Sequence, residues 1–301
     1  MGMAAAQVSG GPSAGVRRVA VVGGGTMGSG IAQVFATADF EVELVDARPE
    51  LVARALDGMA RSLERVARKQ EWTAGRAAEV LARIHGGTRL EAARDCPVAV
   101  EAVNEDAALK REIFARLDAL APPAAVLASN TSSISITGLA AATRRPAQVI
   151  GMHFMNPVPV MRLVELIRGL ATSDATCALA TDLAVRLGKT PVEVNDAPGF
   201  VSNRILMPMI NEACFALMEG VATKEAIDTV MTLGMAHPMG PLTLADLIGL
   251  DVCLNILEVL HRDLGDPKYR PCPLLRRMVE AGRLGRKSGR GFYEYPEAPR
   301  A

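Results

Sequence analysis

The stretch RRVAVVGGGTMGSGIAQVFATADFEVELVDA, residues 17–47, decides how this chain begins to fold. Residues 19–22 form a short apolar run, which is typical of a strand buried on both faces of a sheet. Glycines follow, and apolar residues from Ile31 to Ala38 then recur with helical spacing. Residues 41–46 alternate and are rich in β-branched side chains, so they predict a second strand. The stretch therefore predicts a βαβ unit.

Three glycines, Gly23, Gly25 and Gly28, form the pattern G-x-G-x-x-G between the first predicted strand and the helix. Glycines can fall at this spacing by chance, but here an acidic residue, Asp46, also ends the next strand, close to the ~20-residue offset of dinucleotide-binding units. In such units the glycines allow a tight turn, a close approach of the pyrophosphate and close packing of helix on strand. Free N–H groups at the helix N-terminus attract the phosphates. The pattern therefore predicts a dinucleotide site.

The acidic residue, Asp46, favours NAD over NADP as the dinucleotide. A carboxylate at this position accepts hydrogen bonds from the adenosine ribose diol, and it repels a 2′-phosphate. Arg48 lies nearby and could weaken this repulsion, so NADP stays open as the less favoured cofactor. A simple cap at the end of the strand is the alternative interpretation of Asp46.

The rest of the chain indicates an α/β protein with two domains, because 301 residues exceed what one small core needs. Apolar runs predict further strands at 98–103, 125–133 (running into a polar turn), 148–154, 161–167 and 190–196. Helical spacing occurs at 50–84 (with a possible break at Gly75), 109–120 and 173–188. This alternation predicts a Rossmann-type, doubly wound and mostly parallel sheet. After DAPGF, residues 196–200, helical patterns predominate and predict an all-α C-terminal domain. The expected divisions are a disordered tail at 1–15, a nucleotide-binding domain at 16–197 and a helical domain at 198–301.

Charge and cysteine content argue against several classes of function. Basic and acidic residues number 33 each, so the chain lacks the basic excess of proteins that bind nucleic acid or a membrane surface. No apolar run approaches the ~20 residues of a membrane span, and the N-terminal residues lack the pattern of a secretory signal. The five cysteines are scattered without a CxxC pair. We therefore expect no disulfide framework and no metal site, and a reducing cytoplasm.

One histidine, His153, stands in the apolar segment GMHFMNP, residues 151–157. A buried histidine satisfied by a backbone carbonyl is the simplest explanation. However, His153 falls at the carboxyl end of a predicted strand, which faces the ligand crevice in open α/β sheets. Glu165 lies on the next predicted strand, and a charge among apolar neighbours needs a partner. We expect a His–Glu dyad in which Glu165 orients the imidazole and His153 exchanges a proton. A salt bridge from Glu165 to Arg162 or Arg168 is the alternative.

Two polar clusters could complete a site around this histidine. SNTSS, residues 129–133, follows a buried strand, so its hydroxyl and amide groups should lie near the same crevice. A helix N-cap by Ser132 or Ser133 is the alternative there. Asn203 and Arg204 stand at the start of the helical domain, where they could face a cofactor or form a solvated first turn.

Six motifs together resemble the 3-hydroxyacyl-CoA dehydrogenase family, and most of all its short bacterial 3-hydroxybutyryl-CoA dehydrogenases. They lie in order at family spacing over residues ~16 to ~295. The motifs are VVGGGTMGSGIAQVFA, ASNTSSISIT, GMHFMNPVPVMRLVELI, DAPGFVSNRILMPMINEA, HPMGPLTLADLIGLDV and GRLGRKSGRGFYEY.

The resemblance implies a role for each matching residue. His153 matches the catalytic base and Glu165 its partner carboxylate, whereas Ser132 and Asn203 match residues that hydrogen-bond the substrate near its 3-hydroxyl and thioester groups. The residues implied to bind the cofactor are Gly23, Gly25, Thr26, Met27, Gly28, Asp46, Glu105, Lys110, Asn130 and Asn156. A basic helical segment close to the coenzyme A phosphates is matched by Arg65, Arg68 and Lys69. A solvated helix face explains those three residues as well.

The resemblance also implies an activity: hydride transfer between NAD(H) and a short-chain (S)-3-hydroxyacyl-CoA / 3-oxoacyl-CoA pair, above all 3-hydroxybutyryl-CoA / acetoacetyl-CoA. The helical domain would contribute to substrate binding and form a homodimer. Two alternatives remain. One is a related dehydrogenase of a free 3-hydroxy acid or a sugar acid such as gulonate, and the other is a dinucleotide-sensing protein with an inactive site. A purely structural dimerisation protein would leave the glycine loop unexplained.

Overall fold

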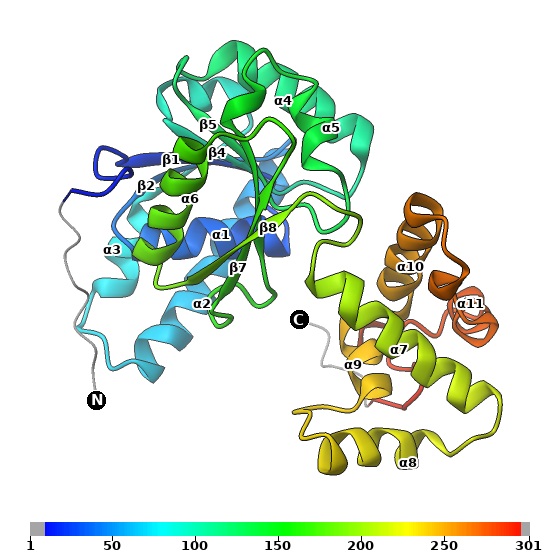
Figure 1. The fold of residues 1–301 in the computed structure, drawn as a ribbon. Coiled ribbons are helices and arrows are strands. Elements are labelled where there is room, and N and C mark those ends of the chain that lie inside the picture. Colours follow the sequence, from blue (N-terminus) through cyan, green and yellow to red (C-terminus); the bar gives the residue numbers. More distant parts are fainter. Residues whose placement is uncertain (1–9, 296–301) are drawn as a thin grey trace. The chain divides into compact units, whose positions relative to one another are not determined.

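The computed structural model describes residues 10–295 and contains two compact units, Met1–Asp196 and Ala197–Ala301 (Figure 1). Each unit has an apolar core of its own. Residues 1–9 of the predicted tail lie outside the described residues. For residues 10–15 the prediction of disorder is wrong, because Ser13 is fully buried and its hydroxyl donates to Asp182 Oδ2 at 2.5 Å. The small residues of this segment resemble a disordered tail in the sequence, but the hydrogen bond to Asp182 holds the segment in place.

The first unit contains a sheet of eight strands in the order β3-β2-β1-β4-β5-β6-β7-β8. All neighbours are parallel except β6 and β7, which run antiparallel. The strands are β1 (Arg18–Val22), β2 (Glu41–Val45), β3 (Ile84–Gly87), β4 (Val98–Glu101), β5 (Val126–Ser129), β6 (Val149–Phe154), β7 (Leu163–Arg168) and β8 (Thr190–Asn195). The prediction of a mostly parallel, doubly wound sheet is confirmed.

Helices cover both faces of this sheet (Figure 1). One face packs against α1 (Thr26–Thr37), α2 (Pro49–Lys69), α3 (Arg76–Ala82) and α6 (Asp174–Arg186). The other face packs against α4 (Ala107–Leu120), α5 (Ile136–Ala140) and the 3₁₀ turn η1 (Leu90–Asp95). A further 3₁₀ turn, η2 (Pro146–Gln148), precedes β6. Because strands buried on both faces need apolar side chains in both directions, the central strands β1, β4 and β5 are mainly apolar along their length.

Strand β3 was not predicted, since the sequence there continues a helical pattern through residue 84. The structure divides that pattern into α2 and α3, with Gly75 at the N-cap of α3, and then places β3 beside β2. The segment Ile84–Gly87 contains two glycines and little apolar periodicity. Its strand conformation therefore depends on pairing with β2 rather than on a local pattern.

The second unit is helical, as predicted. It contains α7 (Ser202–Met218), α8 (Lys224–Thr229), the π-helical turn η3 (Val230–Gly234), α9 (Pro241–Ile248), α10 (Leu250–Leu264), η4 (Pro267–Tyr269), α11 (Pro273–Glu280) and η5 (Arg286–Ser288). Buried Asp246 accepts hydrogen bonds from the backbone of Phe292 and Tyr293, both at 2.9 Å, and so fixes the end of the described chain on this core. Within residues 10–295, no helix is both long and apolar enough to cross a membrane.

Candidate functional site

The glycine loop follows β1 and leads into α1, and its shape excludes side chains at two positions. Gly23 adopts φ +109°, and a Cβ there would lie 2.6 Å from the carbonyl oxygen of Ala102. A Cβ on Gly28 would lie 1.8 Å from the carbonyl oxygen of Gly23. The loop therefore folds back tightly on itself and against the end of β4, which only glycine permits.

The N-terminus of α1 is arranged to receive an anion. Gly25 is its N-cap, contributes no side-chain cap, and would place an added Cβ in open space. No acidic residue stands in the first turn, where Thr26 is exposed and Met27 packs against the apolar core. The first N–H groups of a helix without a side-chain cap, together with the helix dipole, favour a phosphate.

A cavity of about 520 Å³ adjoins this loop. Its polar wall includes the glycine loop and Asp46, and its apolar wall includes Leu51, Leu90 and Ile113 from three different elements. Asp46 Oδ2 accepts from the N–H of Gly24 at 2.6 Å, and Oδ1 accepts from the N–H of Ala47 at 2.7 Å. These bonds hold the Asp46 carboxylate at the cavity wall. Capping the end of the strand and binding a ribose are therefore compatible roles for Asp46. The apolar lining and the carboxylate are the groups that the base and the ribose diol of a dinucleotide require.

His153 and Glu165 meet across the one antiparallel pair of the sheet. They are direct partners in the β6–β7 register, and side chains at such positions lie on the same face. His153 Nδ1 lies 2.8 Å from Glu165 Oε2, and the two side chains are 10% and 3% exposed. A buried carboxylate at this distance fixes the ring orientation and favours a proton on Nδ1.

One of the two alternative partners proposed for Glu165, Arg168, pairs with other carboxylates. The guanidinium of Arg168 pairs with Asp174 at 2.5 Å and with Glu193 at 3.1 Å. Strand β6 ends at Phe154, so His153 stands at its carboxyl end, as the sequence predicts. The structure therefore assembles an imidazole and a carboxylate at the edge of the sheet that faces ligands in open α/β folds.

The SNTSS turn after β5 wraps around the carboxylate of Glu105. Glu105 Oε1 accepts from the Thr131 hydroxyl at 2.5 Å and from the backbone N–H groups of Ser132 and Ser133, both at 3.0 Å. The helix that follows, α5, is capped by Ser135, whose hydroxyl accepts from Gly138 N at 3.1 Å. Neither Ser132 nor Ser133 is thus the N-cap, and both belong to the turn centred on Glu105.

Glu105 is held in its ionised form by this turn. Burial opposes ionisation, but the charge of Lys110 and the hydrogen bonds from Thr131, Ser132 and Ser133 outweigh it and keep the pKa of Glu105 below its usual value. Because folding lowers this pKa, the ionised carboxylate stabilises the folded protein at neutral pH, and the contribution is lost as the pH falls through the acid range.

A buried ion pair beneath this turn was not predicted. Glu101, at the end of β4, is fully buried, and its Oε1 accepts from Lys110 Nζ at 2.6 Å. Its Oε2 accepts from the Ser129 hydroxyl at 2.7 Å. Lys110 is 1% exposed and also donates to the carbonyl oxygen of Val103 at 3.2 Å. The signal that could have revealed Glu101 is a charge inside the apolar run VAVEAV, residues 98–103. Lys110, which the family resemblance places among the cofactor-binding residues, lies beneath the loop that carries Glu105.

A second buried cation supports the loop between β6 and β7. Lys189 is 9% exposed and donates to the carbonyl oxygens of Val158 and Met161. Burial lowers the pKa of Lys189. This loop also carries Asn156, which is exposed and precedes a cis proline. Two backbone carbonyls held by one ammonium fix the connection that returns the chain from His153 to Glu165.

The two remaining amides of the predicted site lie in different environments. Asn130 is 9% exposed, and its Oδ1 accepts from the backbone N–H of Phe154 at 2.9 Å. In the second unit, Asn203 lies in the first turn of α7 and is 8% exposed, so it is not the solvated residue of the alternative interpretation. Arg65, Arg68 and Lys69 are exposed near the end of α2. Basic side chains there interact favourably with the negative end of the helix dipole.

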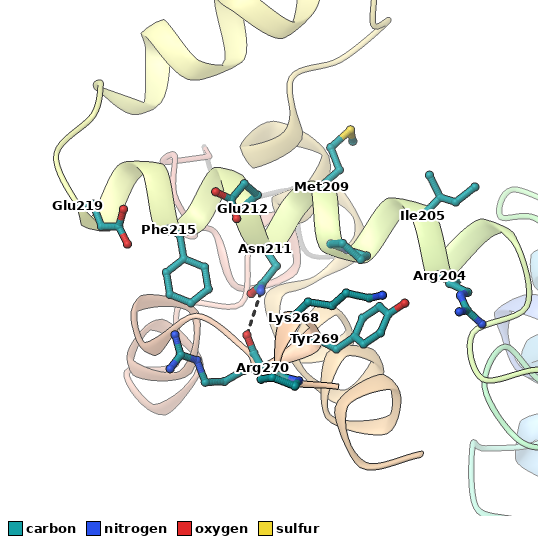
Figure 2. Close-up of a pocket in the computed structure, with 12 residues that line it drawn as sticks. Arg204, Ile205, Met209, Asn211, Glu212, Phe215, Glu219, Lys268, Tyr269 and Arg270 are labelled. Atoms are coloured by element: carbon teal, nitrogen blue, oxygen red, sulfur yellow. Dashed lines mark hydrogen bonds between the residues drawn. The ribbon is translucent and has the colours of Figure 1, made fainter. Parts of the chain in front are cut away.

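The second unit contains a hollow of about 790 Å³ beside α7 (Figure 2). Figure 2 shows Arg204, Ile205 and Phe215 on α7, with Lys268 and Arg270 on the segment below. Both acidic and basic side chains line the hollow, and the side chain of Ile205 is 69% exposed.

Comparison with known proteins identifies relatives of both units. The family model of the 3-hydroxyacyl-CoA dehydrogenase NAD-binding domain matches residues 18–197, and that of the C-terminal domain matches residues 199–295. A probable 3-hydroxybutyryl-CoA dehydrogenase of Bacillus subtilis is 57% identical over 94% of this chain and 98% of its own length. The 3-hydroxybutyryl-CoA dehydrogenase of Bradyrhizobium diazoefficiens is 51% identical over 93% of this chain and 96% of its own. The crystal structure of (S)-3-hydroxybutyryl-CoA dehydrogenase from Ralstonia eutropha matches with a TM-score of 0.90 and 51% identity, covering 94% of this chain and 100% of that one. The family resemblance predicted from the motifs is confirmed.

Proposed function

Because this chain belongs to the 3-hydroxyacyl-CoA dehydrogenase family, we propose that it transfers a hydride between NAD(H) and a short-chain (S)-3-hydroxyacyl-CoA / 3-oxoacyl-CoA pair. The preferred pair would be 3-hydroxybutyryl-CoA and acetoacetyl-CoA, the substrate class in the names of the relatives. The observation that carries the proposal is the buried pair of His153 and Glu165, 2.8 Å apart at the carboxyl end of β6.

The proposed role of His153 is to exchange the proton of the 3-hydroxyl group. In oxidation the imidazole removes this proton, and in reduction the protonated imidazole returns it to the forming alkoxide. Glu165 would orient the ring, since its buried carboxylate lies 2.8 Å from Nδ1. The nicotinamide, when bound, accepts or supplies the hydride, so the residues of this chain provide orientation and the proton.

Ser132 and Asn203 are the proposed substrate contacts. A hydroxyl and an amide near the 3-oxygen would donate hydrogen bonds as negative charge develops there. Ser132 belongs to the turn that Glu105 holds rigid through backbone bonds, so its position is fixed before substrate binds. Arg65, Arg68 and Lys69 are proposed to attract the coenzyme A phosphates, because all three side chains are exposed and basic.

NAD is the proposed cofactor, with NADP disfavoured. The Asp46 carboxylate at the cavity wall suits a ribose diol and repels a 2′-phosphate. The glycine loop and the uncapped start of α1 would hold the pyrophosphate. The cytoplasm is the proposed compartment, which agrees with five buried free cysteines.

The test of this function is reduction of acetoacetyl-CoA, followed as loss of NADH absorbance. We expect rapid turnover of the thioester, with NADH favoured over NADPH by at least about tenfold because a like-charge contact costs several kcal/mol. Free acetoacetate should be inert. Turnover of the free acid but not the thioester would identify a free-acid dehydrogenase instead. NADH binding without turnover of any thioester would favour the sensor alternative.

We also propose that the second unit forms a homodimer through the face around α7. The hollow of Figure 2 offers both charge signs beside exposed Ile205 and Val201, and a second copy could supply complementary charges and cover these side chains. Light scattering of the intact chain should give twice the monomer mass of 31.8 kDa.

The substitution Ile205→Asp should shift this equilibrium toward the monomer, because it places a charge on an apolar contact. Leu170→Asp is the matched control, since Leu170 is a 91%-exposed side chain on the other unit. A monomeric wild-type protein, or equal dissociation by both variants, would contradict this interface.

A further inference from the structure

One backbone N–H beside His153 is bound by a side chain rather than by a neighbouring strand. The parallel ladder between β5 and β6 ends at the pair Ser129 and Gly151. Phe154, three residues farther along β6, donates its N–H to Asn130 Oδ1 at 2.9 Å in a buried environment. The Asn130 side chain, just after β5, thus holds β6 in place beyond the last backbone pair of these two strands.

Asn130 is itself fixed from behind by Glu101. The N–H of Asn130 donates to the carbonyl oxygen of Glu101 at 2.8 Å, and the hydroxyl of the preceding residue, Ser129, donates to the Glu101 carboxylate at 2.7 Å. Lys110 holds that carboxylate at 2.6 Å. A buried hydrogen-bonded chain of this kind rigidifies the groups at its end.

We propose that Asn130 is a positioning residue for His153. Glu165 restrains the imidazole from the β7 side, and Asn130 fixes the peptide group between His153 and Phe154 from the β5 side. With both restraints the ring points in one direction. The inference deepens the proposed function, on which the kinetic part of its test rests.

This role differs in its consequences from the cofactor contact that the family resemblance implies for Asn130. A cofactor contact mainly affects NADH affinity, whereas a positioning residue affects the step in which the proton moves. A misplacement of about 1 Å in a catalytic group can lower a rate by about 100-fold without any change in binding. The two roles therefore separate in kcat and in the dissociation constant of NADH.

The first experiment compares Asn130→Ala with Thr172→Val in the full chain. Thr172 fixes the opposite end of the same strand: its buried hydroxyl accepts from Gly169 N at 2.9 Å and donates to the Val149 carbonyl oxygen at 2.6 Å. Asn130→Ala should lower kcat for acetoacetyl-CoA by about 10- to 100-fold. Its NADH dissociation constant, measured by fluorescence, should stay near the wild-type value. Thr172→Val should leave kcat close to wild type.

A second readout does not depend on activity. The chain has only four histidines, so the ¹⁵N side-chain resonances of His153 can be assigned by comparison with His153→Gln. Asn130→Asp keeps an acceptor for the Phe154 N–H and adds a negative charge. We expect its His153 resonances to titrate at higher pH than in the wild type and the acid limb of its kcat profile to move the same way. Thr172→Val should move neither.

Two results would overturn the proposal. One is an Asn130→Ala protein with wild-type kcat and weakened NADH binding, which would make Asn130 a cofactor contact. The other is an unchanged His153 titration in Asn130→Asp, which decides the question even if Asn130→Ala fails to fold. If wild type reduces no thioester, the proposed function fails by itself, and the titration still tests the positioning role.

Discussion

Replacing His153 by glutamine is expected to lower kcat for acetoacetyl-CoA reduction by about 10²- to 10⁴-fold, the usual contribution of a positioned acid–base group. Glutamine fills a similar volume and can still donate a hydrogen bond to Glu165, but it cannot exchange a proton. NADH affinity should stay near wild type, because His153 does not line the cavity beside the glycine loop. Steady-state kinetics and an NADH fluorescence titration measure the two quantities.

The chain supplies a matched control in a second histidine–carboxylate pair. His85 Nε2 lies 2.9 Å from Glu41 Oε2, with the two side chains 48% and 42% exposed. His85→Gln therefore removes an imidazole from the same sheet without touching the buried pair, and its kcat should stay at the wild-type level. A His153→Gln protein that retains wild-type turnover would refute the proposed proton role.

Replacing Lys110 by methionine is expected to lower the free energy of unfolding of the first unit by about 3–5 kcal/mol, because it leaves a buried carboxylate without its counter-charge. Glu101 is fully buried, and the ammonium 2.6 Å away is its charged partner. The chain's single tryptophan, Trp72, packs against the core of this unit, so its fluorescence in a urea titration reports this unit's unfolding.

Two further variants separate the buried charge from the loss of a lysine. The double variant Glu101→Gln with Lys110→Met should recover part of the lost stability, since no charge remains buried. Arg89→Met breaks a largely exposed pair with Glu91, at 3.7 Å, and should cost less than about 1 kcal/mol. Equal losses from Lys110→Met and Arg89→Met would contradict the assignment of a buried ion pair.

Several contacts of the candidate site follow from the sequence because their signals are local. The spacing of Gly23, Gly25 and Gly28 after an apolar strand predicts the loop, and the structure shows why a Cβ cannot enter at Gly23 and Gly28. His153 and Glu165 lie 12 residues apart on two apolar strands joined by a short connection. Because the connection is short, the sequence could predict that the two strands are neighbours and that these side chains meet.

Other contacts could not be predicted, because their partners are distant in the sequence and carry no pattern of their own. The hydroxyl of Ser13 bonds to Asp182, 169 residues away, and orders a segment that resembles a tail. Asn130 Oδ1 accepts a hydrogen bond from the N–H of Phe154, 24 residues away, in place of a backbone carbonyl of the neighbouring strand. Polar side chains make such bonds wherever the fold brings a donor and an acceptor together, so spacing alone gives no sign of them.

By itself the sequence determined the alternation of strands and helices, the glycine loop with its acidic partner, the helical second unit and the family. These features depend on the periodicity of apolar residues and on the backbone freedom of glycine, which act over a few residues. Only the tertiary structure decided that β3 is a strand, that Lys110 lies beneath Glu105, and that Asn130 and Glu101 support the strand bearing His153. The physical reason is desolvation: a buried amide, carboxylate or ammonium must find a partner, and the packed fold determines which partner is within reach.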